Sequence, residues 1–270
     1  MESFGQVASV GSVSTVAKGM QLIALSGFPR VEPGDDLAAL ITASLAENGL
    51  SLEPGDVLVL AQKIVSKAED CYVRLSEVEP SEEALDLARR ADKDPRQAEL
   101  ILRESAAIVR VRPGVVIVEH RNGYVHANAG IDKSNIQIDP ADPRVLLLPR
   151  DPDVSAEDLR RALGELTGVA PQVIINDSAG RAWRNGTVGI AIGTAGLQPL
   201  LNQVGDEDMF GNVLEVTEPA VADELAAAAS LVMGQAAEAC PVVLVRGANL
   251  APAECGSSSL LRDRSMDMFR

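Results

Sequence analysis

The chain has 270 residues, 46% of them hydrophobic and 23% charged, so it can bury a large core in one domain or in two modest ones. Aromatic residues make up only 3%, so Val, Leu, Ile and Ala must build the core, as is typical of α/β architectures with buried sheets. The net charge of −15 argues against nucleic acid as a partner, because phosphate backbones bind basic surfaces, but a few local cations and metal ions can still hold a nucleotide.

The cysteines and the N-terminal segment predict a cytoplasmic protein. Cys71, Cys240 and Cys255 are widely spaced and form no C-x-x-C pair, which favours reduced thiols over a disulfide framework or a zinc site. Residues 1–19 are rich in Ser, Val and Gly and lack the basic start of a signal peptide, so we expect a flexible tail. The sequence contains no run of eighteen apolar residues, so we expect no membrane span.

Strand-like and helix-like segments alternate through the first half of the chain. Leu22–Leu25 is a short apolar run, and Asp35 and Asp36 precede apolar residues at helical spacing that stop at Asn48-Gly49. A turn then leads into Val57–Ala61, which has the composition of a buried strand. Further helical segments are predicted to begin at Ser81-Glu82-Glu83 and to cover Glu99–Ser105.

The second half continues the alternation and predicts a mixed α/β or α+β fold. Asn122-Gly123 is a hairpin signal between the strand-like segments Val115–Glu119 and Tyr124–Ala127. The Pro- and Asp-rich stretch Asp139–Arg144 is the best candidate hinge between two closely packed lobes. The other predicted elements are strands at Val145–Leu148, Val173–Ile175, Val188–Ile192 and Pro241–Val245, a helix over Ser155–Leu166 capped by Ser155, and a helix over Glu218–Met233.

Three polar segments follow buried strands and lie in Gly-rich turns, and loops at strand ends are where rigid scaffolds commonly place functional groups. The first, Ala61–Glu69, carries Lys63 and Lys67 four residues apart, together with Ser66 and Glu69. Lysines are point-charge donors to phosphate, and a serine hydroxyl can add a hydrogen bond. An ordinary solvated helix face is the alternative interpretation.

The second segment, Asn128–Asn135, combines small residues with Asp132 and suits a tight turn that brings the backbone close to a ligand. Asp132 is a candidate ligand for a hard cation, because Mg²⁺ and Mn²⁺ prefer carboxylate oxygen. The alternative is a turn whose Asp and Asn side chains cap their own backbone.

The third segment, Asn176–Gly186, contains Asp177, Ser178, Arg181 and Arg184 after an apolar strand. An acid that can bind metal beside arginines that can bind phosphate is the combination that phosphoryl transfer needs. A purely structural Arg/Asp network remains the alternative. The residues by themselves therefore predict a nucleotide- and metal-dependent enzyme.

Several standard motifs are missing from the sequence. It contains no G-x-x-x-x-G-K-[ST] phosphate loop, no G-x-G-x-x-G at a helix start and no G-x-S-x-G nucleophile elbow. His120 and His126 lie near the predicted hairpin, and neither has a second potential metal ligand at a suitable spacing in the sequence. This favours a structural role for both.

Taken in order, these segments resemble the coenzyme F-420:L-glutamate ligase family, also called F-420-0:gamma-glutamyl ligases, from about Leu22 to Arg270. The combination of many ordered matches is specific, although each match alone is weak. The matching residues are Gln62–Glu69, Ala127–Asn135, Asp177–Gly186, Ala191–Gly193, Asp208–Gly211, Ala222–Ala226 and the last four residues, Asp267–Arg270.

The resemblance implies an unusual two-lobed α+β fold with mixed sheets, in which residues 20–270 form a single ligase domain that is homodimeric, with the site near the lobe and subunit interface. It implies a GTP-dependent ligase that uses two divalent ions, Mg²⁺ or Mn²⁺, with K⁺ as a further candidate. The carboxylate of a deazaflavin precursor would attack the γ-phosphate of GTP, and L-glutamate would displace phosphate from the resulting acyl phosphate. Later additions would be γ-linked.

The resemblance also assigns roles to individual residues. Asp132 and Asp177 would bind metal, with help from the Ser178 hydroxyl, and Arg181 would act with the two aspartates in catalysis. Glu69 and Asn135 are further candidates for the binding site. Contacts to phosphates or to other anionic groups of the substrates would come from Lys63, Ser66, Lys67, Arg181 and Arg184.

The sequence departs from the family pattern at Asp70, Ala182 and three further positions that bear on the acceptor. Ala179 replaces an aromatic residue, Gly189 stands where an acid is frequent, and the basic residue usual near Val204 is missing. These departures leave two alternatives open: the same chemistry on another carboxylate, such as a folate or a small acid, or a nucleotide-binding regulator without catalysis.

Overall fold

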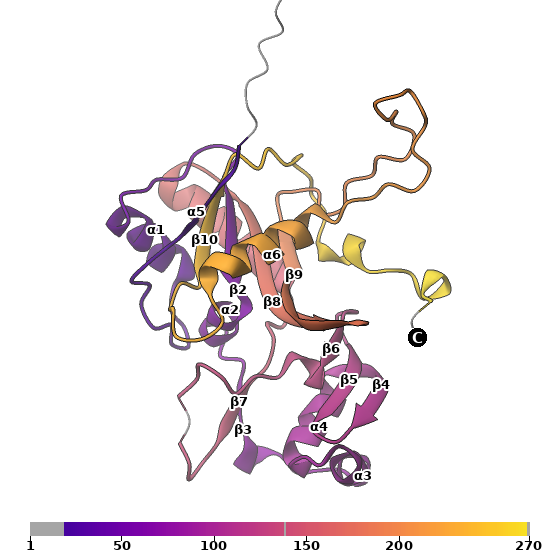
Figure 1. The fold of residues 1–270 in the computed structure, drawn as a ribbon. Helices are drawn as coiled ribbons and strands as arrows, with labels where there is room; N and C mark the ends of the chain where they lie inside the picture. The colour runs from indigo at the N-terminus through magenta and orange to yellow at the C-terminus, as the bar shows by residue number, and fades with distance from the viewer. Residues whose placement is uncertain (1–18, 138, 269–270) are drawn as a thin grey trace, which may run out of the picture.

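The computed structural model describes residues 19–137 and 139–268, so the tail predicted at 1–19 lies, apart from Gly19, outside the described residues. None of the helices in these ranges combines the length and the hydropathy that a membrane-spanning helix needs. The predicted α+β fold of two lobes with mixed sheets is confirmed: a larger lobe holds a five-stranded sheet, and a smaller lobe holds sheets of two and three strands (Figure 1).

The sheet of the larger lobe has the strand order β1-β10-β2-β8-β9. β2 and β8 are parallel, and every other neighbouring pair is antiparallel. Its central strands are continuous apolar runs because both faces of the sheet are covered. The strands are β1 (Gln21–Ala24), β2 (Val57–Ala61), β8 (Gln172–Arg181), β9 (Arg184–Ala195) and β10 (Val242–Arg246).

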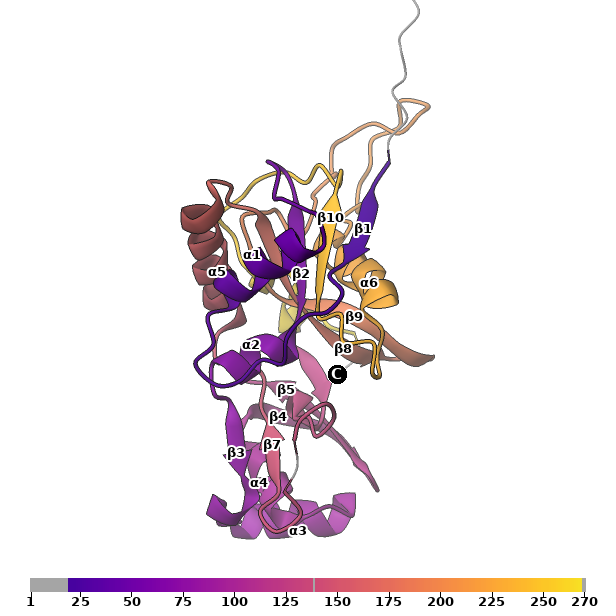
Figure 2. The same cartoon turned by 90° about the vertical axis from the view of Figure 1, so that its left-hand side faces the viewer.

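Helices cover the two faces of this sheet. α1 (Leu37–Glu47) and α5 (Pro152–Thr167) pack on one face, and α6 (Val221–Met233) packs on the other, as the edge-on view in Figure 2 shows. α1 is capped by Asp36, whose side chain accepts a hydrogen bond from the N–H of Ala39. The short helix α2 (Gln62–Ala68) follows β2 directly and leads toward the smaller lobe.

The smaller lobe is built from the middle of the chain. Helices α3 and α4 pack against the sheet β4-β5-β6, and the pair β3-β7 lies beside this sheet, on the side of α2 (Figure 1). The C-terminal segment returns to this lobe, where Arg264 forms an ion pair with Glu119. The elements are β3 (Tyr72–Arg74), α3 (Glu82–Ala91), α4 (Pro95–Arg103), β4 (Ser105–Arg112), β5 (Val115–His120), β6 (Val125–Ala127) and β7 (Arg144–Leu146).

Some predicted element bounds were wrong. Asp151, not Ser155, caps α5, and Pro152 occupies its first turn. The helical segment predicted over Glu99–Ser105 begins earlier, at Pro95, and Ser105 already belongs to β4. The largest error concerns Asn176–Gly186, because most of this segment lies in the two paired strands β8 and β9 rather than in a loop.

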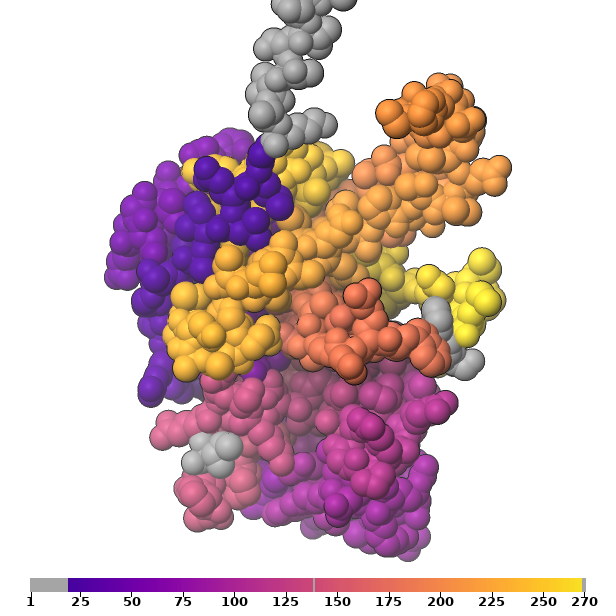
Figure 3. Space-filling view, viewed as in Figure 1, coloured from indigo at the N-terminus to yellow at the C-terminus, as the bar shows by residue number. Residues whose placement is uncertain are grey.

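A long arm projects from the larger lobe between β9 and α6. Residues 201–219 form this arm, whose two sides are joined by backbone hydrogen bonds such as Gln203 N to Thr217 O. Figure 3 shows it standing away from the rest of the molecule. Its tip exposes Met209 and Phe210, which are 89% and 82% accessible. Large exposed apolar side chains of this kind commonly mark an interaction surface.

The packing of α6 on β9 depends on Gly189. A Cβ at this position would lie 2.3 Å from the carbonyl oxygen of Ala226 and 2.3 Å from Oγ of Ser230. We therefore expect Gly189→Ala to lower the free energy of unfolding by about 3 kcal/mol through overpacking. Gly180→Ala on the paired strand is the control, because a Cβ there meets nothing within 4 Å. Equal stability of the two variants in urea titrations would contradict this prediction.

Candidate active site

A cavity of about 770 Å³ opens where the two lobes meet. Its position follows from the parallel pairing of β2 with β8, in which Ala61 faces Asn176. The residues that follow these partners, Gln62 and Lys63 on α2 and Asp177 on β8, therefore gather at the same edge of the sheet. The other walls come from residues 28–32, from residues 132–137 of the smaller lobe and from the loop 234–241.

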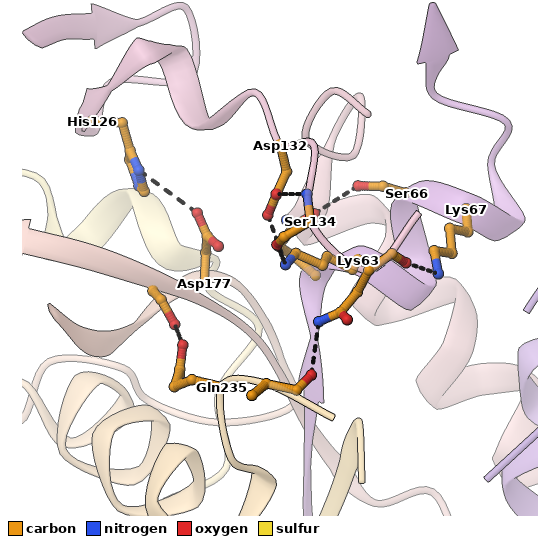
Figure 4. A network of polar contacts seen from close by, with 12 residues as sticks. Lys63, Ser66, Lys67, His126, Asp132, Ser134, Asp177 and Gln235 are labelled. Atoms are coloured by element: carbon orange, nitrogen blue, oxygen red, sulfur yellow. Dashed lines mark hydrogen bonds and ion pairs between the residues drawn. The ribbon is translucent and has the colours of Figure 1, made fainter. Parts of the chain in front are cut away.

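Asp132 and Lys63 form the most tightly connected polar group of the cavity (Figure 4). The Lys63 ammonium lies 2.7 Å from Oδ2 of Asp132 and donates a hydrogen bond to Oγ of Ser134, while the Ser134 N–H donates to Oδ1 of Asp132. Burial alone would raise the pKa of Asp132, but Lys63 and the Ser134 N–H outweigh it and hold the pKa below its usual value. Asp132 is therefore ionised at neutral pH.

Asp177 is less well neutralised. Its side chain is only 14% exposed, and burial, with a smaller contribution from the charge of Asp132, raises its pKa to about 6. The Ser178 N–H, Lys63 and Gln62 oppose this rise.

His126 is the nearest histidine, with Nδ1 3.6 Å from Oδ2 of Asp177 (Figure 4). Burial lowers the pKa of His126 to about 4, so it carries no charge that could stabilise the carboxylate at neutral pH. Asp177 is thus a buried carboxylate without a strong cationic partner among the described residues.

The donor set fits a divalent cation of the Mg²⁺ type. In the part of the chain that the structure describes, no cluster of three or more His, Cys, Asp or Glu side chains is arranged to hold a metal, so the protein does not supply a closed cage. Mg²⁺ is characteristically held by one or two carboxylates, together with water and the phosphates of a substrate. The under-neutralised Asp177 beside Asp132, with the Ser178 hydroxyl on the same cavity wall, suits such an ion.

Two loops of the cavity are held together by hydrogen bonds. Lys67 donates from Nζ to the carbonyl oxygen of Asn135 over 2.8 Å, and Nδ2 of Asn135 donates to the carbonyl oxygen of Ala236 over 3.1 Å. The Ser178 hydroxyl donates to Oε1 of Gln235 over 2.9 Å. The predicted residues Lys67, Asn135 and Ser178 therefore link α2, the smaller lobe, β8 and the loop after α6.

Not every predicted site residue lies at this cavity. Ser66 is fully buried and donates to Oε1 of Gln62, so it acts behind the cavity wall. Glu69 lies at a second, more open hollow, where it accepts hydrogen bonds from Ser155 and from the N–H of Arg150. Arg181 and Arg184 lie near the tip of the β8–β9 hairpin, outside the cavity lining, and Arg181 donates to the carbonyl oxygens of Gly186 and Asn185.

Several polar residues that line the cavity were not predicted from the sequence. Gln62 lies in a predicted segment but was not selected, and Arg144 was assigned to a hinge. Gln235 follows Gly234, whose φ of +74° ends α6, and a glycine directly after a long Ala-rich helix was a usable signal for a special backbone conformation. The other missed polar residues at the cavity include Arg30, Glu32, Tyr72, Gln137, Thr187 and Glu238.

Comparison with known proteins gives consistent matches over nearly the whole chain. The family model of F420-0:Gamma-glutamyl ligase matches residues 27–247. The coenzyme F420:L-glutamate ligase of Methanothermobacter thermautotrophicus is 50% identical over 254 residues, covering 93% of this chain and 99% of the relative. The proteins of the same name from Methanopyrus kandleri and Archaeoglobus fulgidus are 48% and 40% identical and cover 89% and 93% of this chain, and 94% and 96% of their own lengths.

Proposed function

Because the chain belongs to the F420-0:gamma-glutamyl ligase family, we propose that it joins L-glutamate to the carboxylate of a deazaflavin F420 precursor, using GTP and a divalent metal ion. The observation that carries this proposal is the group of Asp132, Asp177 and Lys63 at one cavity, where two lobes and both carboxylates converge. This group suits phosphoryl transfer between anionic reactants.

The reaction needs activation because a carboxylate is a poor electrophile. In the first step, an oxygen of the acceptor carboxylate attacks the γ-phosphorus of GTP, the bond to the β-phosphate oxygen breaks, and GDP leaves. In the second step, the amine of glutamate attacks the carbonyl carbon of the acyl phosphate, phosphate departs with the former carboxylate oxygen, and the amine loses its proton. The product is an amide, and a repeat on the γ-carboxylate of the new residue gives the γ-linked additions.

The residues of the cavity divide this work. Asp132 and Asp177, with the Ser178 hydroxyl, would hold a divalent ion, which when bound neutralises charge between the approaching anions. Lys63 and Lys67 supply fixed positive charge for phosphate oxygens. The links from Asn135 to Ala236 and from Ser178 to Gln235 keep the walls of the cavity at a fixed separation.

The two rival functions have weaker support. A different acceptor was motivated by Ala179, Gly189 and Val204, yet none of the three is among the residues that line the cavity. Gly189 packs against α6, and Val204 lies in the arm. A regulator without catalysis is disfavoured because both aspartates and both lysines of the expected site converge.

The homodimer is also part of the proposal, with the arm at its interface. The reason is that Met209 and Phe210 would otherwise remain in water at the tip of the arm. We expect the double change Met209→Ser and Phe210→Ser to weaken association at least tenfold, measured by sedimentation velocity over a dilution series. Leu166→Ser, an exposed apolar position at the end of α5, is the control. A wild-type protein that sediments as a monomer at every concentration would contradict the dimer.

The function itself is tested by phosphate release. Purified protein with GTP, Mg²⁺ or Mn²⁺, the F420 precursor and L-glutamate should release phosphate in step with loss of the free precursor. Omission of any single component should stop the release of phosphate. Release that is independent of the precursor, or that occurs only with a folate or another acid in its place, would overturn the assignment of the acceptor.

A further inference from the structure

The cavity has a cationic side that the proposed chemistry does not use in full. Arg30, Lys67 and Arg144 line it, next to the aromatic ring of Tyr72. Within the described ranges, none of these three cations has a carboxylate within ion-pair distance. Glu32 and Glu238 also border the cavity, and Glu32 acts on Lys67 from further away, while the Glu238 carboxylate accepts a hydrogen bond from the Ala236 N–H. In a chain of net charge −15, such a concentration of unpaired positive charge calls for an anionic ligand.

The pKa of Lys67 is lowered chiefly by burial and in smaller part by the neighbouring cations. Burial lowers the pKa of Lys67, and the charges of Lys63, Arg144 and Arg30 lower it further, while only Glu32 opposes them. An anion bound among these groups would relieve their mutual repulsion, so the site favours a ligand with more than one negative charge.

Arg144 is the best-oriented member of this group. It begins β7, and its guanidinium carbon lies 3.9 Å from the centre of the Tyr72 ring on the paired strand β3. Its Nε donates a hydrogen bond to the carbonyl oxygen of Gln137 over 3.2 Å. The stacking and this single hydrogen bond fix the plane of the guanidinium, and the described residues provide no hydrogen-bond acceptor for its two terminal nitrogens.

We propose that Arg144, held against Tyr72, binds a phosphate oxygen of the nucleoside triphosphate through its terminal nitrogens. This inference rests on the proposed use of GTP and adds a phosphate contact from the smaller lobe. A planar fork with free donors matches the geometry of a phosphate group, whereas Lys67 offers only a point charge. The nucleotide would thereby bridge the two lobes, with Lys67 on α2 and Arg144 on β7.

The test measures binding by calorimetry in the full-length protein with Mg²⁺, using a slowly hydrolysed GTP analogue and, separately, inorganic triphosphate. Arg144→Gln should weaken the binding of both about 10- to 100-fold, as expected for loss of a hydrogen bond between charged groups. Arg144→Lys should recover part of this loss, because it keeps the charge but not the fork.

Arg74→Gln is the matched control. Arg74 is the Cα partner of Arg144 on β3, but its side chain is 63% exposed, lies 3.7 Å from Asp142 and does not line the cavity. Arg74→Gln should leave the affinities for the GTP analogue and for triphosphate unchanged. In steady-state assays, Arg144→Gln should raise KM for GTP and leave KM for the acceptor unchanged.

The outcomes separate this inference from the proposed function. If the wild-type protein binds neither GTP analogue nor triphosphate, the use of a nucleotide falls and the inference falls with it. If the wild type binds both and Arg144→Gln binds them equally well, the inference alone is overturned. Weakened binding of the analogue with unchanged binding of triphosphate would assign Arg144 to the nucleoside, and a raised KM for the acceptor alone would assign it to that substrate; either result would overturn the phosphate contact.

Discussion

Replacing Asp177 by Asn is expected to lower the rate of glutamate ligation by about a thousandfold at saturating substrates. The change keeps the size of the side chain but removes the charge that would hold a divalent ion beside the reacting phosphate, and such an ion contributes several kcal/mol to the stabilisation of the transition state. Since each 1.36 kcal/mol is a tenfold change in rate, the loss corresponds to about 4 kcal/mol. Single-turnover product formation, followed by mass spectrometry, measures it.

Asp132→Asn should have an effect of similar size, because it removes the second carboxylate and leaves the Lys63 ammonium without its ion-pair partner. Asp86→Asn, on the exposed surface of α3, is the matched control and should retain full activity. Asp177→Asn that ligates at more than a tenth of the wild-type rate would remove this carboxylate from the mechanism.

Asp177→Asn should also stabilise the metal-free protein at neutral pH. The folded-state pKa of Asp177 is raised to about 6 from the ordinary 3.8, so the folded state holds this proton more tightly than the unfolded state. The contribution of the protonated Asp177 side chain to stability is therefore fully present below pH 3.8 and is lost as the pH rises through about 6. The raised pKa of Asp177 corresponds to a loss of roughly 3 kcal/mol in the free energy of unfolding at pH 7.5. Asp177→Asn should restore this stability.

Urea titrations of both proteins in the presence of a chelator test this expectation. The variant should exceed the wild type by roughly 3 kcal/mol at pH 7.5, and the difference should shrink toward zero as the pH falls to 4. Added Mg²⁺ should stabilise only the wild type, and more strongly above pH 6, because the ion requires the ionised carboxylate. A wild type that is more stable than Asp177→Asn at pH 7.5 without metal would mean that Asp177 is already neutralised in the fold.

The elements that were predicted well are those with local signals. Val57–Ala61 was predicted with its exact bounds, since a continuous apolar run after a Pro-Gly turn is typical of a buried strand. The helix after Asp36 and its end at Asn48 follow from a capping side chain and a stop signal. β8 was predicted as only three residues because Asn, Asp and Gly disfavour strands, and its polar half is held in the sheet by long-range pairing with β9.

Only part of the candidate site was predictable from local signals in the sequence. Segments that follow buried strands identified Lys63, Asp132 and Asp177, and the parallel pairing of β2 and β8 brings two of them together. Arg181 and Arg184 are close to Asp177 in the sequence, but the extended hairpin carries them away from the cavity. The role that we infer for Arg144 arises only from tertiary structure, because nothing in the sequence indicates that Tyr72 lies beneath it.

The most direct test of the account uses an F420 precursor whose reacting carboxylate is labelled with ¹⁸O. The protein is incubated with this precursor, GTP, L-glutamate and Mg²⁺, and both the acceptor and the released phosphate are examined by mass spectrometry. With both oxygens of this carboxylate labelled, we expect a precursor extended by glutamate and one ¹⁸O atom in the phosphate released by the first addition, because one carboxylate oxygen leaves with the phosphoryl group. A glutamylated product with unlabelled phosphate would contradict the acyl-phosphate route, and the absence of any glutamylated product would contradict the proposed function.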